Sequence, residues 1–262
     1  MAEPASYLLS TGDEGAALAR EYEVTADIHL DDPLFGHLRG AHGQDVKAAL
    51  RAYLESGRTG ALKIRDLLAA LQGAKVVDGR IAERMTILDF AAGYGCVARH
   101  LRNVIPEAKV VTIDFEDKAM YFNTAHLGVQ AAVADANPAR VNPFFQFDLV
   151  YALSIFTRMP RDRIGPWLEK LAQFAKAGGI IVFTAHGTAT HRDHLPHIEV
   201  NEEGFGYERT SGQRDLDERG HAITYPRLVF KEIDRLRNID PVLFQAAAWW
   251  GHQDLYVVRK TA

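Results

Sequence analysis

Strand-like and helix-like segments alternate along the middle of this 262-residue chain, and this alternation restricts the fold more than any other feature of the sequence. Short apolar runs, several of them rich in β-branched residues, are typical of strands, and the segments between them repeat apolar residues at helical spacing. Strands that alternate with helices form a parallel sheet with helices on both faces. We therefore predict five strands, at 86–90, 109–114, 129–134, 147–153 and 179–184.

The two ends of the chain have different patterns. The N-terminal third contains no strand-like run, and its apolar residues at helical spacing predict two helices that Gly57 and Gly60 separate. Near the C-terminus a helix is followed by two strand-like runs joined by a short turn, which predicts an antiparallel pair. These C-terminal segments are 227–237, 242–249 and 253–258.

Composition and charge exclude some classes of partner. The net charge is −4, and lysines and arginines form no cluster interleaved with aromatic residues, so we do not expect a nucleic-acid partner. Cys96 is the single cysteine, which rules out an intramolecular disulfide and is typical of a reducing compartment. The first 30 residues lack a signal-peptide pattern, and no apolar run approaches the ~18 residues of a membrane span. We expect a cytoplasmic protein with no membrane partner.

A glycine-rich turn joins the first predicted strand to the next helix, within the run TILDFAAGYGCVARHL at 86–101. Such turns hold phosphates, nicotinamide dinucleotides or S-adenosylmethionine. The run from Gly93 through Gly95 to Ala98 satisfies a relaxed dinucleotide pattern, and Asp114 follows at the distance expected for a ribose-binding acid. A tight connection that binds nothing is a further alternative. The turn alone therefore leaves its ligand open.

Carboxylates near the ends of the first three predicted strands favour a cationic ligand. Asp89 precedes the turn, where a negative charge is awkward beside a pyrophosphate but suits the α-ammonium group of S-adenosylmethionine. Asp114 can accept both ribose hydroxyls, and Asp135 can accept from the adenine amino group. By itself Asp114 would be read as a cap of a helix at 117–127. Together the three acids favour a sulfonium ligand.

From about residue 86 to its end, the chain resembles the class I S-adenosylmethionine-dependent methyltransferases. It looks most like bacterial members in which the usual D-x-G-x-G-x-G loop appears as D-F-A-[AS]-G-Y-G. The runs FDLVYALSIFTRMP and AKAGGIIVFTAHG resemble the family's fourth and fifth strands, and HQDLYVV ends a hairpin that resembles its antiparallel last pair. The matching residues are Asp89, Gly93 and Gly95 for the first motif, Asp114 for the ribose-binding acid, and Asp135 with Ala136 for the adenine-binding segment.

The resemblance implies S-adenosylmethionine as the cofactor and an α/β, Rossmann-like fold. Its seven-stranded sheet would be mostly parallel with an antiparallel last strand, beside an N-terminal helical lid. The expected domains are a helical cap at 1–84 and a cofactor-binding methyltransferase domain at 85–262, with an insertion at 186–225. The residues expected to bind the cofactor are Asp89, Phe90, Ala91, Gly93, Gly95, Asp114, Phe115, Asp135, Ala136, Ala152 and Leu153.

Ala91 departs from the family pattern, because other members have glycine at this position. Its methyl group takes room from the methionine part of the ligand, which is tolerable if φ at this residue stays negative. Arg99 and His100, which follow the turn, are expected on the solvent side of the first helix of the α/β domain.

Three residues are candidates for contact with the methyl acceptor. His186 directly follows the fifth strand, at the sheet edge where ligands bind, and its imidazole can act as a base. A polar residue that only turns the chain is an equal alternative for His186. Arg158 and Tyr22 are the candidate substrate contacts, against readings as a surface charge and an exposed helix residue.

The polar stretch 186–225 interrupts the alternation, and a connection of this length is typical of a functional insertion or a mobile loop. His191, His194 and His197 recur every three residues within it, but Pro196 breaks a helix there and the spacing matches no familiar metal site. We expect a solvated loop that contacts substrate, and no bound metal.

We therefore predict a methyltransferase that uses S-adenosylmethionine to methylate an oxygen or nitrogen nucleophile of a small molecule or a saccharide. The alternatives are a non-catalytic module that binds S-adenosylmethionine and an NAD(P)-dependent oxidoreductase. An antiparallel last strand inserted beside the fifth strand would count against the oxidoreductase. The sequence leaves the acceptor atom and the oligomeric state open.

Overall fold

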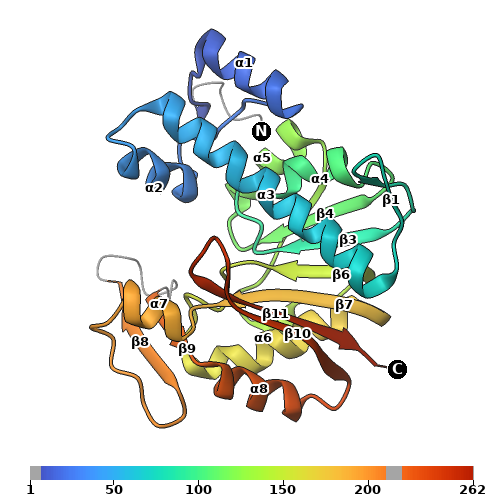
Figure 1. The fold of residues 1–262 in the computed structure, drawn as a ribbon, viewed down its shortest axis with the longest axis vertical. Helices are drawn as coiled ribbons and strands as arrows, with labels where there is room; N and C mark the ends of the chain where they lie inside the picture. Colours follow the sequence, from blue (N-terminus) through green and yellow to red (C-terminus); the bar gives the residue numbers. More distant parts are fainter. Residues whose placement is uncertain (1–6, 211–219, 262) are drawn as a thin grey trace. The chain divides into compact units, whose positions relative to one another are not determined.

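The computed structural model describes residues 7–210 and 220–261 (Figure 1). The chain divides into two compact units. Unit 1 consists of Met1–Met85 and Ala92–Ala134, and unit 2 consists of Thr86–Ala91 and Asp135–Ala262. Unit 1 therefore contains the N-terminal helices together with the glycine turn, and unit 2 contains the first, fourth and fifth predicted strands and everything that follows the fifth.

A seven-stranded sheet has the strand order β10-β11-β7-β6-β3-β4-β5. In unit 2, β6 is parallel to β3 and β7, and β11 is antiparallel to β7 and β10. In unit 1, β4 and β5 are parallel. The strands are β3 (Thr86–Phe90), β4 (Lys109–Asp114), β5 (Gln130–Val133), β6 (Phe147–Ala152), β7 (Ala175–Ala185), β10 (Ile239–Trp249) and β11 (Gln253–Lys260). This confirms the predicted sheet, including the antiparallel last strand beside the fifth.

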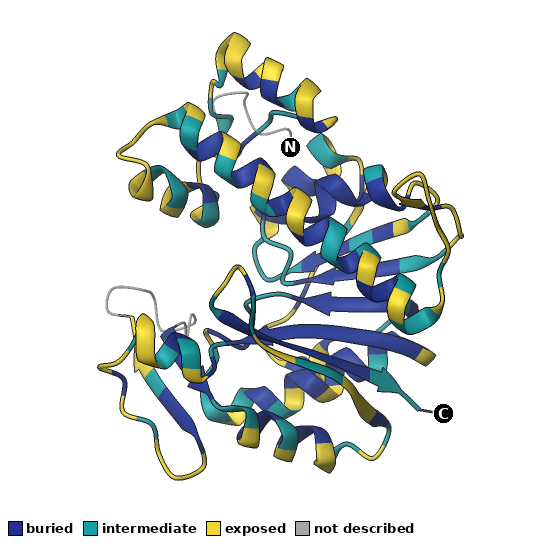
Figure 2. Cartoon of the chain, in the orientation of Figure 1, coloured by how far each residue is buried: buried dark blue, intermediate teal, exposed yellow. Residues whose placement is uncertain are grey.

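Two helices cover the strands of unit 2, α6 (Arg161–Phe174) and α8 (Pro226–Arg235). They pack against each other, with α6 on β6 and β7 and α8 on β10 (Figure 1). Most residues of β3, β6 and β7 are buried, as Figure 2 shows, because a central parallel strand is covered on both faces. Phe90 of β3 packs against Trp167 of α6, with ring centroids 5.1 Å apart. Burial of such a ring contributes about 1.5–3 kcal/mol.

The helices of unit 1 begin at clear sequence signals. Asp32 accepts the N–H groups of the first turn of α2 and precedes a proline at the first helical position. Asp45 caps α3 in the same way, and Gly73 ends α3 in a left-handed conformation. The five helices are α1 (Gly12–Tyr22), α2 (Pro33–Ala41), α3 (Val46–Gln72), α4 (Ala98–Val104) and α5 (Asp117–Leu127). A short hairpin, β1 (Val76–Val77) and β2 (Arg80–Ile81), follows α3.

The predicted break at Gly57 and Gly60 is wrong, because α3 is one continuous helix through both residues. Gly57 serves close packing instead. A Cβ atom at this position would overlap the carbonyl oxygen of Cys96 and lie 2.7 Å from Cδ2 of His100. Glycine therefore lets α3 approach the start of α4, and the helix accepts the cost of about 1 kcal/mol that an interior glycine brings.

The expectation that Arg99 and His100 face solvent is also wrong. Their exposed fractions are 7% and 1%, because α3 and the N-terminal segment cover the side of α4 that carries them. Burial and the positive charges of Arg99 and Arg58 lower the pKa of His100 to about 3. Among the described residues, neither ring nitrogen of His100 has a hydrogen-bond partner.

We expect His100 to make the protein sensitive to acid. The unfolded chain takes up a proton near pH 6.5, whereas folded His100 stays neutral down to a pKa of about 3. The free energy of unfolding therefore falls as pH drops below 6.5, by up to about 1.4 kcal/mol per pH unit. In His100→Leu this loss between about pH 6 and pH 4.5 should be smaller, as measured by urea unfolding. His37→Leu, at an exposed site, should keep the wild-type slope, and an unchanged slope in His100→Leu would contradict this account.

The polar stretch 186–225 contains elements that the sequence analysis missed. It forms α7 (Thr188–Asp193) and the antiparallel hairpin of β8 (Phe205–Arg209) and β9 (Gly220–Thr224). Residues 211–219, which belong to the predicted loop, lie outside the described residues. Between residues 7 and 210 and between 220 and 261, every helix is too short or too polar to span a lipid bilayer.

Candidate functional site

The glycine turn in unit 1 directs its carbonyl oxygens toward protein donors. The carbonyl of Ala92 accepts from Gly95 N–H (3.0 Å), that of Gly93 from Asn123 Nδ2 (3.0 Å), that of Tyr94 from Arg99 Nη2 (3.3 Å) and that of Gly95 from Arg99 N–H (3.1 Å). These four hydrogen bonds hold the backbone of the turn in one conformation.

Asp114, at the end of β4, fixes this turn. Its Oδ2 atom accepts the N–H of Gly93 at 2.8 Å, and its Oδ1 atom accepts the N–H groups of Phe115 and Glu116 at 2.7 and 3.1 Å. Glu116, not Asp114, is the residue at the N-cap position of α5. A carboxylate offers about four acceptor positions, so the three backbone donors leave capacity for a ribose hydroxyl.

Three residues of the turn, Ala91, Gly93 and Gly95, have left-handed backbone conformations. Gly93 has φ 52° and Gly95 has φ 69°, which glycine adopts without strain. A Cβ atom at Gly95 would overlap Cδ1 of Leu127 and lie 2.9 Å from Oδ1 of Asn123, so the site also excludes a side chain by contact. Ala91 has φ 59°, against the negative φ under which its methyl group would be tolerable. A non-glycine residue pays roughly 1–2 kcal/mol for this conformation.

We expect Ala91→Gly to stabilise the protein. Glycine relieves the left-handed strain at this residue, and the gain exceeds the added entropy of the unfolded chain by about 0.5–1 kcal/mol. Ala92→Gly is the matched control, because φ at Ala92 is not positive, and it should destabilise by about 0.5–1 kcal/mol. Thermal unfolding of both variants measures the difference. If Ala91→Gly destabilised the protein as much as Ala92→Gly, the left-handed conformation of Ala91 would carry no strain energy.

Asp89 lies in β3 of unit 2, with an exposed fraction of 4%. It pairs in register with Tyr151 of β6. Side chains alternate along a strand, so Asp89 faces away from the α6 side that Phe90 occupies. Phe90 can therefore offer a cofactor only its backbone.

The adenine-binding candidate Asp135 is exposed at the end of β5. Its Oδ1 atom accepts the N–H of Asn137 at 2.7 Å, and its Oδ2 atom lies 3.6 Å from Arg140. The carbonyl of the next residue, Ala136, accepts from Arg163 at 3.2 Å. These contacts hold the segment in a turn and leave acceptor positions on the carboxylate.

At the end of β6, Ala152 is fully buried and Leu153 is half-buried. The next residue, Ser154, has φ 61°. Its N–H donates to Oγ1 of Thr184 at 2.7 Å, and both hydroxyls donate to Oε1 of Gln253, at 3.0 Å from Ser154 and 2.7 Å from Thr184. Left-handed non-glycine residues held by such networks are typical of functional sites. The sequence analysis missed this network, because its members are far apart along the chain.

His186 follows β7 in unit 2 and is half-buried. Burial, together with the nearby charges of His252, His221 and Arg158, lowers its pKa to about 4. The ring centroid of His252 lies 5.9 Å away. Among the described residues, Nδ1 of His186 is buried without a hydrogen-bond partner. The imidazole is therefore neutral near pH 7 and has a nitrogen that a substrate proton donor would satisfy.

The two candidate substrate contacts lie in different units. Arg158 of unit 2 is exposed, and its carbonyl accepts the N–H of Gly220 at 3.3 Å. Tyr22 of unit 1 is buried among the N-terminal helices, which contradicts its reading as an exposed helix residue. Its hydroxyl donates to Glu55 at 2.7 Å.

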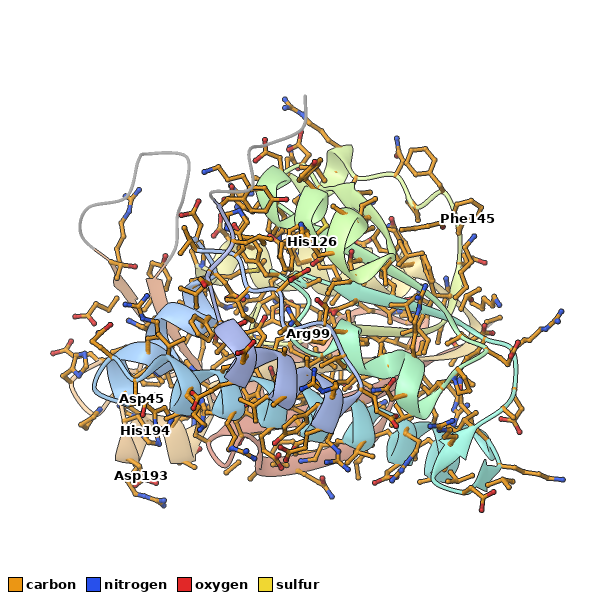
Figure 3. All side chains as sticks on the ribbon, turned by 90° about the horizontal axis from the view of Figure 1, so that it is seen from above. Asp45, Arg99, His126, Phe145, Asp193 and His194 are labelled. Atoms are coloured by element: carbon orange, nitrogen blue, oxygen red, sulfur yellow. The ribbon has the colours of Figure 1, made fainter. Side chains whose placement is uncertain are left out.

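The histidines of the insertion bind separate partners. His191 lies 2.6 Å from the hydroxyl of Tyr225, and His197 lies 3.1 Å from Glu208. The ring of His194, labelled in Figure 3, meets that of His252 edge to face at 5.6 Å. Within the described part of the chain, no group of three or more His, Cys, Asp or Glu side chains is placed to hold a metal ion.

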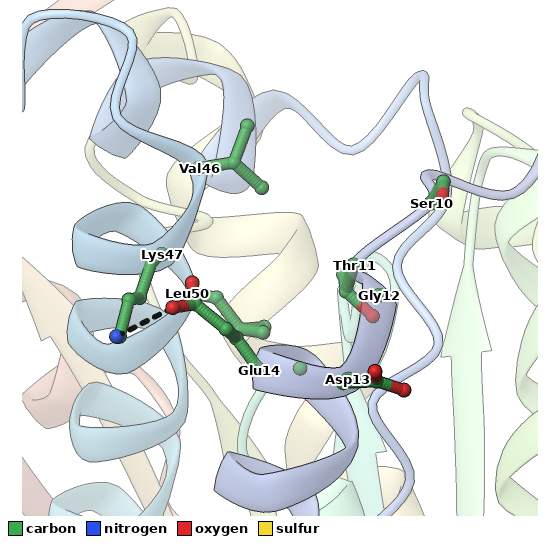
Figure 4. A pocket seen from close by; sticks show the side chains of 9 residues that line it. Ser10, Thr11, Gly12, Asp13, Glu14, Val46, Lys47 and Leu50 are labelled. Carbon is green, nitrogen blue, oxygen red and sulfur yellow. Dashed lines mark hydrogen bonds and ion pairs between the residues drawn. The ribbon is translucent and has the colours of Figure 1, made fainter.

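One hollow of about 390 Å³ lies in unit 1, between the start of α1 and the start of α3 (Figure 4). Its lining runs over residues 10–15 and includes Val46, Lys47 and Leu50. An ion pair of 2.8 Å between Lys47 and Glu14 occupies its edge. None of the predicted site residues lines this hollow, so we do not assign it to the candidate site.

Comparisons with known proteins give a family-model match for part of the chain and solved structures of similar fold. Residues 88–181 match a family model described as a methyltransferase domain. No curated protein matches the chain. Among solved structures, DesVI of Streptomyces venezuelae has a TM-score of 0.58 at 12% identity, over 87% of this chain and 97% of its own.

Two further solved structures share the fold and are named as methyltransferases. The amino pentose methyltransferase CalS10 of Micromonospora echinaspora, with bound S-adenosylmethionine, has a TM-score of 0.54 at 13% identity, over 78% of this chain and 92% of its own. The 1,6-didemethyltoxoflavin-N1-methyltransferase of Burkholderia thailandensis, with bound S-adenosylhomocysteine, has a TM-score of 0.52 at 14% identity, over 100% of this chain and 94% of its own. At these identities the likeness shows a Rossmann-like fold.

Proposed function

We propose that this chain is an S-adenosylmethionine-dependent methyltransferase that acts on an oxygen or nitrogen nucleophile of a small molecule or a saccharide. The observation that carries the proposal is the glycine turn, whose N–H at Gly93 is bonded to the strand-end carboxylate of Asp114 within the region that matches a methyltransferase domain. The solved methyltransferases of similar fold include enzymes named for an amino pentose and for 1,6-didemethyltoxoflavin, which favours a small acceptor. A net charge of −4 disfavours nucleic acid.

The cofactor, when bound, supplies an electrophilic methyl group on a sulfonium and a neutral thioether as leaving group. We assign Asp89 to the α-ammonium group, Asp114 to the ribose hydroxyls and Asp135 to the adenine amino group, each by opposite charge or acceptor capacity. Phe90, Ala152 and Leu153 would contribute backbone or apolar contacts. The loop D-F-A-A-G-Y-G would belong to the bacterial variant, with residues 1–84 as a helical cap on a domain at 85–262.

His186 is the proposed base. Its neutral imidazole is available at physiological pH because burial holds its pKa at about 4. The Nδ1 atom would accept a hydrogen bond from the acceptor O–H or N–H and take the proton as the nucleophile attacks the methyl group. Alignment of the nucleophile and exclusion of water would come from Arg158 and the described parts of the insertion, 186–210 and 220–225.

The strand order disfavours the oxidoreductase alternative, because β11 lies antiparallel between β7 and β10. An assay of turnover distinguishes a methyltransferase from a non-catalytic module that only binds S-adenosylmethionine. We expect the protein to release S-adenosylhomocysteine from S-adenosylmethionine when one member of a panel of saccharides, amines and phenols is added. Tight binding of S-adenosylmethionine without turnover on any acceptor of the panel would favour the non-catalytic module.

A further inference from the structure

Arg99, labelled in Figure 3, is a buried arginine near the start of α4. Its guanidinium group bonds two parts of unit 1 at once. Its Nη1 atom donates to the carbonyls of Thr25 and Asp27, at 3.3 and 3.2 Å. Its Nη2 atom donates to the carbonyl of Tyr94 in the glycine turn, at 3.3 Å. One guanidinium group therefore links the N-terminal segment 24–29 to the turn.

Two carbonyls of the segment 24–29 accept hydrogen bonds from α4. Residues 24–28 have no regular secondary structure, so their carbonyls need partners from elsewhere in the protein. Arg99 supplies two of these partners. Asn103, one helical turn later on α4, donates to the carbonyls of Tyr22 and Glu23 at 3.0 and 3.1 Å.

Ring contacts link the same two parts of unit 1 a second time. The ring of Tyr94 stacks on His29 with centroids 4.6 Å apart, and His29 stacks on Tyr7 at 5.1 Å. Tyr94 is thus contacted at its carbonyl by Arg99 and at its ring by the segment that Arg99 holds. A displacement of this segment would move the turn residue through both contacts.

The surroundings of Arg99 favour a guanidinium over an ammonium group. The guanidinium lies over the ring of Tyr53, 5.0 Å from its centroid, and Tyr53 donates to the buried carboxylate of Asp32 at 2.7 Å. A planar fork can reach carbonyls on two sides while it stacks on a ring, whereas the ammonium of lysine is a single point. Lysine at this position would keep the positive charge but could not bond the carbonyls of segment 24–29 and of Tyr94 at the same time.

We propose that Arg99 is a positioning residue that couples the order of segment 24–29 to the cofactor affinity of the glycine turn. The inference rests on the proposed function, because it takes the turn to bind the cofactor. The coupling free energy between two sites is the same in both directions. If an ordered segment 24–29 raises cofactor affinity, cofactor binding must therefore stabilise the ordered segment by the same free energy. Typical couplings change affinity by about 5–150-fold.

Hydrogen exchange of the full-length protein with and without S-adenosylhomocysteine tests the reciprocal effect. We expect the ligand to slow exchange of the amides at 24–29 by about 10-fold in the unaltered chain, and this measurement needs no variant. Ligand binding without any change in exchange at 24–29 would overturn the coupling and leave the proposed function intact. Absence of ligand binding would overturn both.

The matched variants are Arg99→Lys and Arg102→Lys. Arg102 lies on the same helix but is exposed and bonds the single carbonyl of Gly128, at 3.0 Å. By calorimetric titration, Arg99→Lys should bind S-adenosylhomocysteine about 10-fold more weakly and lose the protection at 24–29. Arg102→Lys should match the wild type in both. Equal affinity of Arg99→Lys and wild type would contradict the proposal.

Discussion

Asp114→Ala should weaken binding of S-adenosylhomocysteine by about 100-fold or more. The substitution removes the acceptor that fixes the N–H groups of Gly93, Phe115 and Glu116, and with it the proposed acceptor of the ribose hydroxyls. Hydrogen bonds to a charged group contribute about 1.5–3 kcal/mol each, so loss of the one bond to the ligand for which Asp114 has capacity, together with loss of the bonds that fix the turn, corresponds to about that factor. Isothermal titration calorimetry measures the change.

Asp117→Ala is the control for this prediction. Asp117 is an exposed acid three residues further along, and its carboxylate bonds only the N–H of Lys118 among the contacts described for it. It should leave the affinity unchanged. Asp114→Asn keeps one acceptor oxygen and should lose less than Asp114→Ala. Binding by Asp114→Ala within about threefold of the wild type would remove Asp114 from the cofactor site.

His186→Ala should slow methyl transfer by about 100-fold to 10,000-fold, which is the usual contribution of a general base. Affinity for S-adenosylhomocysteine should stay nearly unchanged, because the proposed role of His186 is toward the acceptor. His42→Ala, at an exposed site in unit 1, should keep the wild-type rate. Single-turnover rates with an acceptor found in the panel provide the measurement. An unaffected rate in His186→Ala would exclude His186 as the base.

The pH profile gives a second test of His186. The group is protonated only below its pKa of about 4, so its basic form is complete from about pH 5 upward. The wild-type rate should show no inflection near pH 6.5 from this residue and should fall as pH approaches 4. An inflection near pH 6.5 that disappears in His186→Ala would contradict a buried, neutral imidazole.

The sheet was predictable from sequence because each strand is a separate apolar run with clear ends. The pattern of the last hairpin also predicted that β10 and β11 pair antiparallel, as the register of Phe244 against Tyr256 confirms. The predictions were wrong where the same residue type occurs in two different structural settings. A glycine such as Gly57 predicts a helix break, but it lies inside α3. Its role is close packing against the carbonyl of Cys96, and that contact is not visible in the sequence. Arg99 and His100 are polar, yet α4 is covered on the side that carries them.

The candidate site was predicted from strand ends. Asp89 and Asp114 were chosen because parallel strands expose their carboxyl ends to ligands. The supports of the site were not found, since Asn123 and Arg99 hold the turn through contacts that only the folded chain brings together. The strain at Ala91 was also hidden, because a sequence does not report φ. Which residues bind the cofactor remains a prediction for experiment.

A calorimetric titration with S-adenosylmethionine, S-adenosylhomocysteine and NAD tests the central claim most directly. The account predicts saturable binding of both sulfur compounds and no binding of NAD, since the acids near the strand ends favour a cation and disfavour a pyrophosphate. Binding of NAD together with failure of both sulfur compounds to bind would contradict it.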